Sequence, residues 1–332
     1  MKAMNRMPDD DHVYVQRTGP GSLVADIEKV LSSVGLPKMD STSRTLIKIN
    51  GNFDKVYPGS NTSGWFLDGL LGVLRGQGFH DLAVIEGDLP DFPAARMIRT
   101  TGLINILKKY DVPFIAYENL PRDEHELPRI LQGAQLINVP VFHGHGIAVI
   151  SCAAKNLFGL LPKDRRKYHR VLSEKLLELV QWTSPMFTIV DGTVGLDGES
   201  TRRGNPRRLD LILAGWSPLT IDLVASRIMG YDRDTIPLLV LATERGMLPA
   251  KVTITGEFTW ETLPRYDFRF KHSGVRRAAM TLENTPLFHI PLFLWLEDRL
   301  RRLYHRYNYW KKRELLFSGS WMEYDRVWRQ SS

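Results

Sequence analysis

The stretch Thr45-Leu46-Ile47-Lys48-Ile49-Asn50 decides the fold, because it opens a regular alternation of apolar strands and helices. This β-branched run predicts a strand, and apolar residues then recur at helical spacing over residues 65–74. A second strand is expected at residues 82–85, a second helix at 95–110 and a third strand at 113–116. Strands that alternate with helices form βαβ crossovers, so the sequence predicts a mostly parallel sheet.

The alternation continues through the second half of the chain. Apolar runs predict strands at residues 135–142, 147–150, 186–190, 209–214 and 251–255, and helical spacing predicts helices at 170–180, 219–229 and 236–245. We expect an α/β fold with helices on both faces of a mostly parallel sheet, plus a C-terminal basic helical appendage. The expected parts are an N-terminal lead with one short helix (1–43), an α/β core domain (44–257) and a C-terminal basic, aromatic helical extension (258–332).

Composition excludes several classes of protein. With 43% hydrophobic and 24% charged residues, the chain can build a sizeable core and is not a disordered protein. Its single cysteine, Cys152, cannot by itself form a disulfide, an all-cysteine zinc site or a four-cysteine iron–sulfur cluster. Residues 1–11 lack the apolar segment of a secretory signal, and no stretch reaches the roughly 18 apolar residues of a membrane span. We therefore expect a cytoplasmic protein.

Positive charge gathers in the C-terminal part of the chain. The net charge of +7 divides into −1 for residues 1–200 and +8 for residues 201–332. A long helix expected at 292–316 interleaves arginines and lysines with tyrosines and tryptophans. Such a helix predicts docking on an anionic membrane surface or a partner protein through residues 285–316, or else packing of its aromatic rings on the main domain. No nucleic-acid partner is expected, because the body has no matching basic signal.

Polar residues follow the first predicted strand, where ligands bind in open parallel sheets. Lys48 and Asn50 close this strand, and a loop of small hydroxyl and amide residues then leads into a helix. Free N–H groups at a helix start, with hydroxyls beside them, can bind an anion; a solvated loop with an ordinary cap is the alternative. The expected ligand-binding residues of this region are Lys48, Asn50, Ser60, Asn61, Thr62 and Ser63.

The segment around residues 143–162 carries the predicted chemistry. His143 and His145 point the same way if the backbone is extended, and could hold a metal or a substrate oxygen together. No third ligand is evident, so we predict no metal site. Lys155 lies among small and apolar residues, where desolvation disfavours its charged form unless an anion is near. It is expected to bind an anion or to act as a base or nucleophile; the alternative is a snorkelling surface lysine.

Three further residues complete the expected site. Asp191 opens a segment of three carboxylates and three glycines after a buried strand, which predicts either a loop that approaches a ligand closely or a plain flexible loop. Asp222 lies in the first turns of an apolar helix, where it interacts with the helix dipole or faces the same pocket. Asn156, beside Lys155, is expected to bind the ligand.

Together these motifs resemble the domain of unknown function 362 family over roughly residues 44–246. The resemblance rests on the strand end at 47–50, the helix entry at 58–63, Lys155-Asn156-Leu157-Phe158-Gly159, Tyr168-His169, residues 191–195 and the run 214–230. Many members of that family are iron–sulfur proteins with an appended ferredoxin-like segment, whose cysteines this chain lacks. A fainter similarity to the N-terminal domain of lactate racemase, in the order of elements and the spacing of His145 and Lys155, implies a phosphate- or carboxylate-bearing small ligand at this sheet edge.

These observations favour an enzyme that performs acid/base chemistry on a small anionic metabolite in a biosynthetic pathway, in the isomerase, lyase or oxidoreductase class. In this hypothesis the loop at 60–63 and Lys155 bind the anion, and His143 or His145 acts as the general acid/base with Asp191 as its orienting group or counterpart. The sequence does not identify a cofactor. The alternative is a non-catalytic ligand-binding or scaffold protein that its C-terminal helix attaches peripherally to a membrane or to a protein complex.

Overall fold

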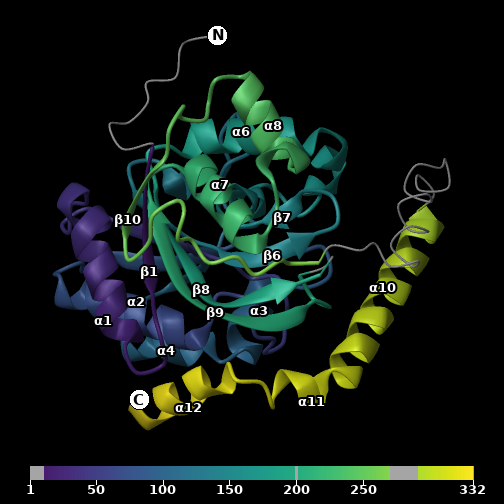
Figure 1. Ribbon diagram of the computed structural model, residues 1–332. Coiled ribbons are helices and arrows are strands. Elements are labelled where there is room, and N and C mark those ends of the chain that lie inside the picture. The colour runs from purple at the N-terminus through teal and green to yellow at the C-terminus, as the bar shows by residue number, and fades with distance from the viewer. Residues whose placement is uncertain (1–10, 199–200, 270–290, 332) are drawn as a thin grey trace.

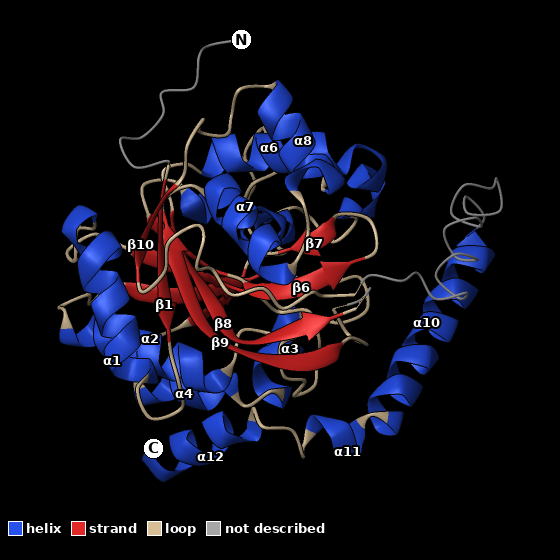
Figure 2. Cartoon of the chain, in the orientation of Figure 1, coloured by secondary structure: helices blue, strands red, loops and turns tan. Residues whose placement is uncertain are grey.

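A computed structural model describes residues 11–198, 201–269 and 291–331. A twisted sheet of ten strands runs through the centre, with helices on both sides (Figures 1 and 2). The strands are β1 (His12–Arg17), β2 (Thr45–Ile49), β3 (Leu82–Glu86), β4 (Phe114–Ala116), β5 (Gln135–Val139), β6 (Val141–His145), β7 (Val149–Ser151), β8 (Phe187–Asp197), β9 (Asn205–Gly215) and β10 (Thr253–Gly256). The α-helices are α1 (Leu23–Val30), α2 (Gly64–Gly76), α3 (Ala94–Thr100), α4 (Leu103–Lys109), α5 (Ala153–Leu157), α6 (Leu172–Thr183), α7 (Pro218–Met229), α8 (Pro237–Glu244), α10 (Pro291–Lys311), α11 (Arg313–Leu316) and α12 (Met322–Ser331).

The sheet is mostly parallel, as predicted. Its strand order is β10-β1-β9-β8-β5-β2-β3-β4, and β6 joins from the side by pairing with β8 and β7. Strand β2 lies between two parallel neighbours, so that Lys48 sits opposite Ile85 of β3 and Asn138 of β5. Only β1, β7 and β9 introduce antiparallel pairs among the described strands. The carboxyl ends of β2, β3 and β5 therefore meet at one edge.

Alternate residues of the central strands pack into two separate cores, one on each face of the sheet. Leu46 belongs to the core that α5, α6, α7 and α8 cover, whereas its neighbour Ile47 belongs to the core beneath α1, α2, α4 and α12. All five residues of β2 are buried. Burial on both faces explains why these strands are continuously apolar, and it makes any charged residue on them exceptional. Lys48 is such a residue.

Three elements in the first half of the chain differ from the sequence-based expectation. Strand β1 lies within the expected lead and pairs with β9 and β10, and the sequence analysis did not predict it. The helix expected at 95–110 is two helices, because Gly102 adopts a φ of 81° between them. The strand expected at 135–142 divides into β5 and β6 at Pro140, which cannot donate a backbone hydrogen bond to a continuing ladder.

The expectation of a loop after Asp191 was wrong. Strand β8 continues to Asp197, antiparallel to β9, with a register shift between Gly192 and Val194. A Cβ at Gly192 would lie 2.5 Å from the carbonyl oxygen of Leu211, and one at Gly195 would lie 2.8 Å from the side chain of Leu209. The glycines thus permit close packing within the sheet.

The C-terminal helices end against the body of the protein, where α12 contacts α2. The helix expected at 292–316 forms as α10 and α11, with a break at Lys312. Helix α12, which was not predicted, returns beside α2, where Tyr324 is buried and stacks on Trp65 at 5.7 Å between ring centroids (Figure 1). Residues 285–290 of the expected docking segment lie outside the described residues. Among the described helices, none combines the length and the apolar character that crossing a membrane requires.

Candidate functional site

A buried ion pair lies at the carboxyl edge of the sheet. Lys48 Nζ on β2 is 2.8 Å from Glu86 Oε1 on the neighbouring strand β3, and both side chains are almost completely buried. The backbone N–H groups of Gly51 and Gly87 also donate to this carboxylate. Burial lowers the pKa of Lys48, and the charge of Glu86 partly opposes that shift. The Glu86 carboxylate is therefore already paired with one cation, Lys48.

The loop before α2 is held by its own polar side chains. Asn61 accepts hydrogen bonds from the N–H groups of Asn52 and Phe53, and Thr62 donates to the carbonyl oxygen of Val139 at 2.9 Å. Asn50 Nδ2 donates to the carbonyl oxygen of Ser60, and the Ser60 hydroxyl donates to that of Thr201. The expected anion-binding loop thus lies at the right edge, but these side chains have protein partners. A direct role for them in ligand binding stays a prediction.

Asp191 links this loop to β8. Its Oδ2 accepts hydrogen bonds from the N–H and the hydroxyl of Ser63, and its Oδ1 accepts from Thr193. Burial raises the pKa of Asp191, although these hydrogen bonds favour the charged form. The carboxylate anchors the start of α2. Its expected catalytic role stays a prediction.

The two histidines of β6 have different surroundings. His143 is buried, and its Nε2 lies 3.1 Å from the carbonyl oxygen of Ser60. A carbonyl only accepts, so Nε2 carries the proton and Nδ1 presents a lone pair, which has no partner among the described residues. Burial, with a smaller contribution from the charge of Lys155, lowers the pKa of His143 to about 4. His143 is therefore neutral near pH 7.

His145 has a structural task in the turn that joins β6 to β7. Its Nδ1 accepts hydrogen bonds from the N–H groups of Ile147 and Ala148, at 3.1 and 3.2 Å. Gly144, between the histidines, is required for packing, because a Cβ there would lie 1.9 Å from the carbonyl oxygen of Gly198. The His-Gly-His pattern thus combines one buried neutral histidine with one turn-forming histidine.

Lys155 lacks a counter-ion in the part of the chain that the structure describes. It extends from α5 and is mostly buried, and its ammonium group lies 4.2 Å from the centre of the Phe158 ring. None of the described carboxylates lies within ion-pair distance of it. Burial, followed by the positive charges of Arg165 and Lys48, lowers its pKa to about 7. The sequence-based expectation of a desolvated amine is consistent with these surroundings.

Asn156 and Asp222 position the helix that carries Lys155. Asn156 Nδ2 donates to Asn138 Oδ1 at 2.8 Å and so ties α5 to β5. Asp222 on α7 accepts hydrogen bonds from the N–H groups of Ala153 and Ala154, the first two residues of α5. Burial raises the pKa of Asp222 to about 7. Both side chains form hydrogen bonds to other parts of the protein. Direct contacts between them and a ligand stay a prediction.

Sequence reasoning missed Arg165 and did not select Glu86. Arg165 is buried, donates to the carbonyl oxygens of Asp88 and Leu161, and forms no ion pair with a carboxylate in the part of the chain that the structure describes. Glu86 could have been found from the sequence, because it ends the strand next to the one that carries Lys48. Arg165 had no such signal, since it begins a short 3₁₀ helix after α5 that no apolar pattern marks in the sequence. We call Lys48, Glu86, His143, Lys155 and Arg165 the cationic cluster.

The cationic cluster suits an anion better than a metal ion. It holds three cationic side chains against one carboxylate, so an added negative charge is favoured by Coulomb attraction. The described residues bring together no group of three His, Cys, Asp or Glu side chains that could bind a metal ion. What the arrangement offers chemically is a group of buried cations, a neutral imidazole lone pair and an amine that exchanges protons near pH 7.

Comparison with known proteins agrees with the family resemblance. The chain is 25% identical over 186 residues to the thylakoid-associated protein sll1697 of Synechocystis sp., a match that covers 51% of this chain and 58% of that protein. These findings do not extend to lactate racemase, so that similarity stays a hypothesis. A family model described as "Domain of unknown function (DUF362)" matches residues 45–227, which run from β2 into α7 and hold the whole cationic cluster. Since this match covers more than half of the chain, the protein belongs to the DUF362 family.

Proposed function

We propose that the cationic cluster binds a small anionic metabolite, with a phosphate or carboxylate group, and that the protein is an enzyme that carries out acid/base chemistry on it. The observation that carries the proposal is Lys155, a mostly buried ammonium group without a described counter-ion beside two further cations. A buried cation without a counter-ion destabilises the folded protein, and such cations are typical of sites that bind a charged ligand.

Within this proposal, each side chain of the cationic cluster has a separate role. Lys155 and Arg165 attract the anionic group, while Glu86 keeps Lys48 charged and in place. His143 Nδ1 is available to accept a proton or a hydrogen bond from a ligand hydroxyl, because the imidazole is neutral and its Nε2–H is already bound. Lys155 can return or remove a second proton, since its pKa of about 7 lets both of its forms exist at neutral pH.

Titration with inorganic phosphate and with succinate tests the proposal, together with native mass spectrometry of the freshly purified protein. We expect one of these anions, or a co-purified one, to bind the wild type and to raise its melting temperature, and Lys155→Met to abolish this effect. Lys163→Met is the matched control, because Lys163 is exposed and close in sequence. Equal anion binding by wild type and Lys155→Met, or no anion under any condition, would refute the site.

A second candidate function is peripheral attachment to a membrane or a protein complex through the C-terminal helices, without catalysis. Two observations favour it: α10 exposes large apolar side chains, and a relative is named as thylakoid-associated. Cell fractionation separates the two candidates, because Lys155→Met should leave localisation unchanged. Point variants of α10 are preferable to truncation, since removal of α12 would also remove the buried Tyr324.

A further inference from the structure

Helix α10 carries an apolar stripe on its outer face. Spacings of four, three, four and three residues separate the members of this stripe, which are Leu296, Leu300, Leu303, Tyr307 and Trp310. At 3.6 residues per turn they fall within about 40° of a single line along the helix. All five are exposed, Leu303 by 60% and Trp310 by 71%. In a globular protein such a stripe normally faces the core.

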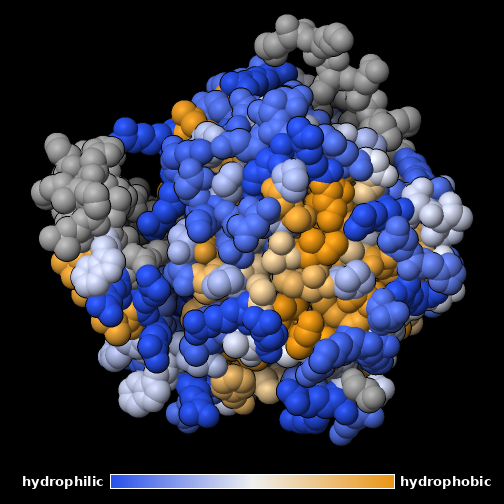
Figure 3. Space-filling view, turned by 180° about the vertical axis from the view of Figure 1, so that it is seen from behind, coloured by the Kyte–Doolittle hydropathy of each residue, from blue (hydrophilic) through white to orange (hydrophobic). Residues whose placement is uncertain are grey.

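The body of the protein holds α10 by the opposite face. His305 is buried there, and the Tyr309 ring packs edge-on against Phe53 at 5.9 Å between centroids. Lys312, just after α10, donates to Asn205 Oδ1 at 2.8 Å. Figure 1 shows α10 as an arm beside the body, and Figure 3 shows hydrophobic side chains on the outer edge of that arm. The helix is therefore fixed by polar and aromatic residues while its apolar side points outwards.

Cations border the stripe along its length. Arg299, Arg302 and Arg306 project on one side of it and Lys311 on the other, and all four are exposed. The Arg299 guanidinium lies 4.7 Å from the centre of the Trp295 ring. An apolar stripe with an arginine border and with tryptophan and tyrosine among its members is typical of a helix that lies in the interface of an anionic membrane.

We propose that α10 docks the protein on an anionic lipid bilayer, with the stripe inserted among the acyl chains and the bordering cations on the headgroup phosphates. This inference rests on the second candidate function and specifies its partner. The stripe is about 21 Å long at 1.5 Å per residue, which suits a helix lying flat on the surface. A second copy of the chain fits less well, because two such faces in contact would bring rows of like charge together.

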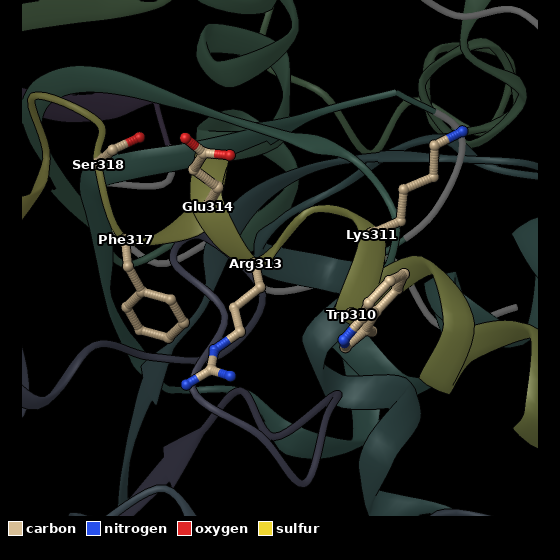
Figure 4. A pocket seen from close by; sticks show the side chains of 6 residues that line it. All are labelled: Trp310, Lys311, Arg313, Glu314, Phe317 and Ser318. Atoms are coloured by element: carbon tan, nitrogen blue, oxygen red, sulfur yellow. The ribbon is translucent and has the colours of Figure 1, made fainter.

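An open hollow adjoins the C-terminal end of the stripe. It measures about 640 Å³, and its lining residues are Trp310, Lys311, Arg313, Glu314, Phe317 and Ser318 (Figure 4). Arg313 and the exposed ring of Phe317 extend to the same side, whereas Lys311 extends away from them, and Glu314 adds a carboxylate to the lining (Figure 4). Arg313 thus adds a cation beside an apolar ring at the end of the stripe.

Vesicle co-sedimentation of the full chain tests this inference, with phosphatidylcholine vesicles compared with vesicles that also contain phosphatidylglycerol. We expect the wild type to bind the anionic vesicles. The affinity of Leu300→Ser/Leu303→Ser for them should be lower by about tenfold or more, because each substitution removes an inserted apolar side chain. Arg299→Gln/Arg302→Gln/Arg306→Gln should lower the affinity by about tenfold or more, and only for the anionic vesicles. Val24→Ser/Val171→Ser is the matched control, because both valines are exposed elsewhere on the body.

The outcomes separate this inference from the function on which it rests. Equal binding to both vesicle types would overturn the preference for anionic lipid and leave membrane attachment standing. No binding to either, with the protein absent from the membrane fraction of cells, would overturn both. A dimer in sedimentation velocity that Leu300→Ser/Leu303→Ser dissociates would show that a second copy covers the stripe. Unchanged circular dichroism in every variant is the folding control.

Discussion

Asp222 on α7 accepts a 2.7 Å hydrogen bond from the backbone N–H of Ala153, the first residue of α5. The same carboxylate accepts from the next N–H, so a side chain from a distant helix caps the start of α5. Lys155 follows one residue after the second of these donors. The direction in which the amine projects from α5 therefore depends on a residue that lies 67 positions away in the sequence, 222 − 155 = 67.

Asp222→Ala should destabilise the protein. Two buried N–H groups lose their acceptor, which costs about 2–4 kcal/mol in the free energy of unfolding. The cost should shrink as the pH rises from about 4 to 7, because the raised pKa makes the folded state bind more protons than the unfolded state in that window. Urea denaturation at both pH values measures this, with the exposed Asp234→Ala as control. A cost that grows with pH would contradict the assigned surroundings of Asp222.

Glu86→Gln should be more damaging than its conservative chemistry suggests. It leaves the Lys48 ammonium buried without its counter-ion, and breaking a buried pair in this way costs about 3–5 kcal/mol. Lys48→Met/Glu86→Leu should recover part of that loss, since it removes both charges together. Urea denaturation of the single and double variants measures the coupling, and Glu124→Gln is an exposed control. A single variant as stable as the wild type would mean that water reaches the pair.

Local patterns were sufficient to predict the fold but not the partners within the site. The apolar run at β2 and the alternation after it reveal the parallel sheet, because burial on both faces leaves a continuous apolar signature. Lys155 was recognisable for the related reason that its neighbours are small and apolar. Arg165 carries no such signal, because its role depends on how the chain after α5 folds back. The Asp191 segment was misread, because glycines that allow tight strand packing have the same sequence signature as glycines of a ligand loop.

His143→Gln should show the opposite pH dependence to Asp222→Ala. Burial lowers the pKa of His143 to about 4, so between about 4 and 6.5 the unfolded state binds more protons than the folded state. The contribution of His143 to stability is therefore complete above about pH 6.5 and is lost as the pH falls towards 4. The stability advantage of the wild type over His143→Gln should widen as the pH rises through this window and stay constant above it. Thermal melts in a pH series measure the difference, and a flat difference would place His143 in contact with water.

Lys155→Met should stabilise the protein while it removes anion binding. Methionine keeps the length and apolar contacts of the side chain but removes a charge that burial disfavours, so the free energy of unfolding at pH 7 should rise by about 1–3 kcal/mol. The folded pKa of about 7 lies below the ordinary value of 10.5, so this advantage should shrink as the pH rises from 7 to 10 and the wild-type lysine loses its proton in the folded state. Urea denaturation at pH 7 and pH 10 measures the trend, with Lys163→Met as the exposed control. A variant that is less stable than the wild type at pH 7 would mean that the ammonium group already has a partner in the folded protein, and it would remove the reason for an anion site.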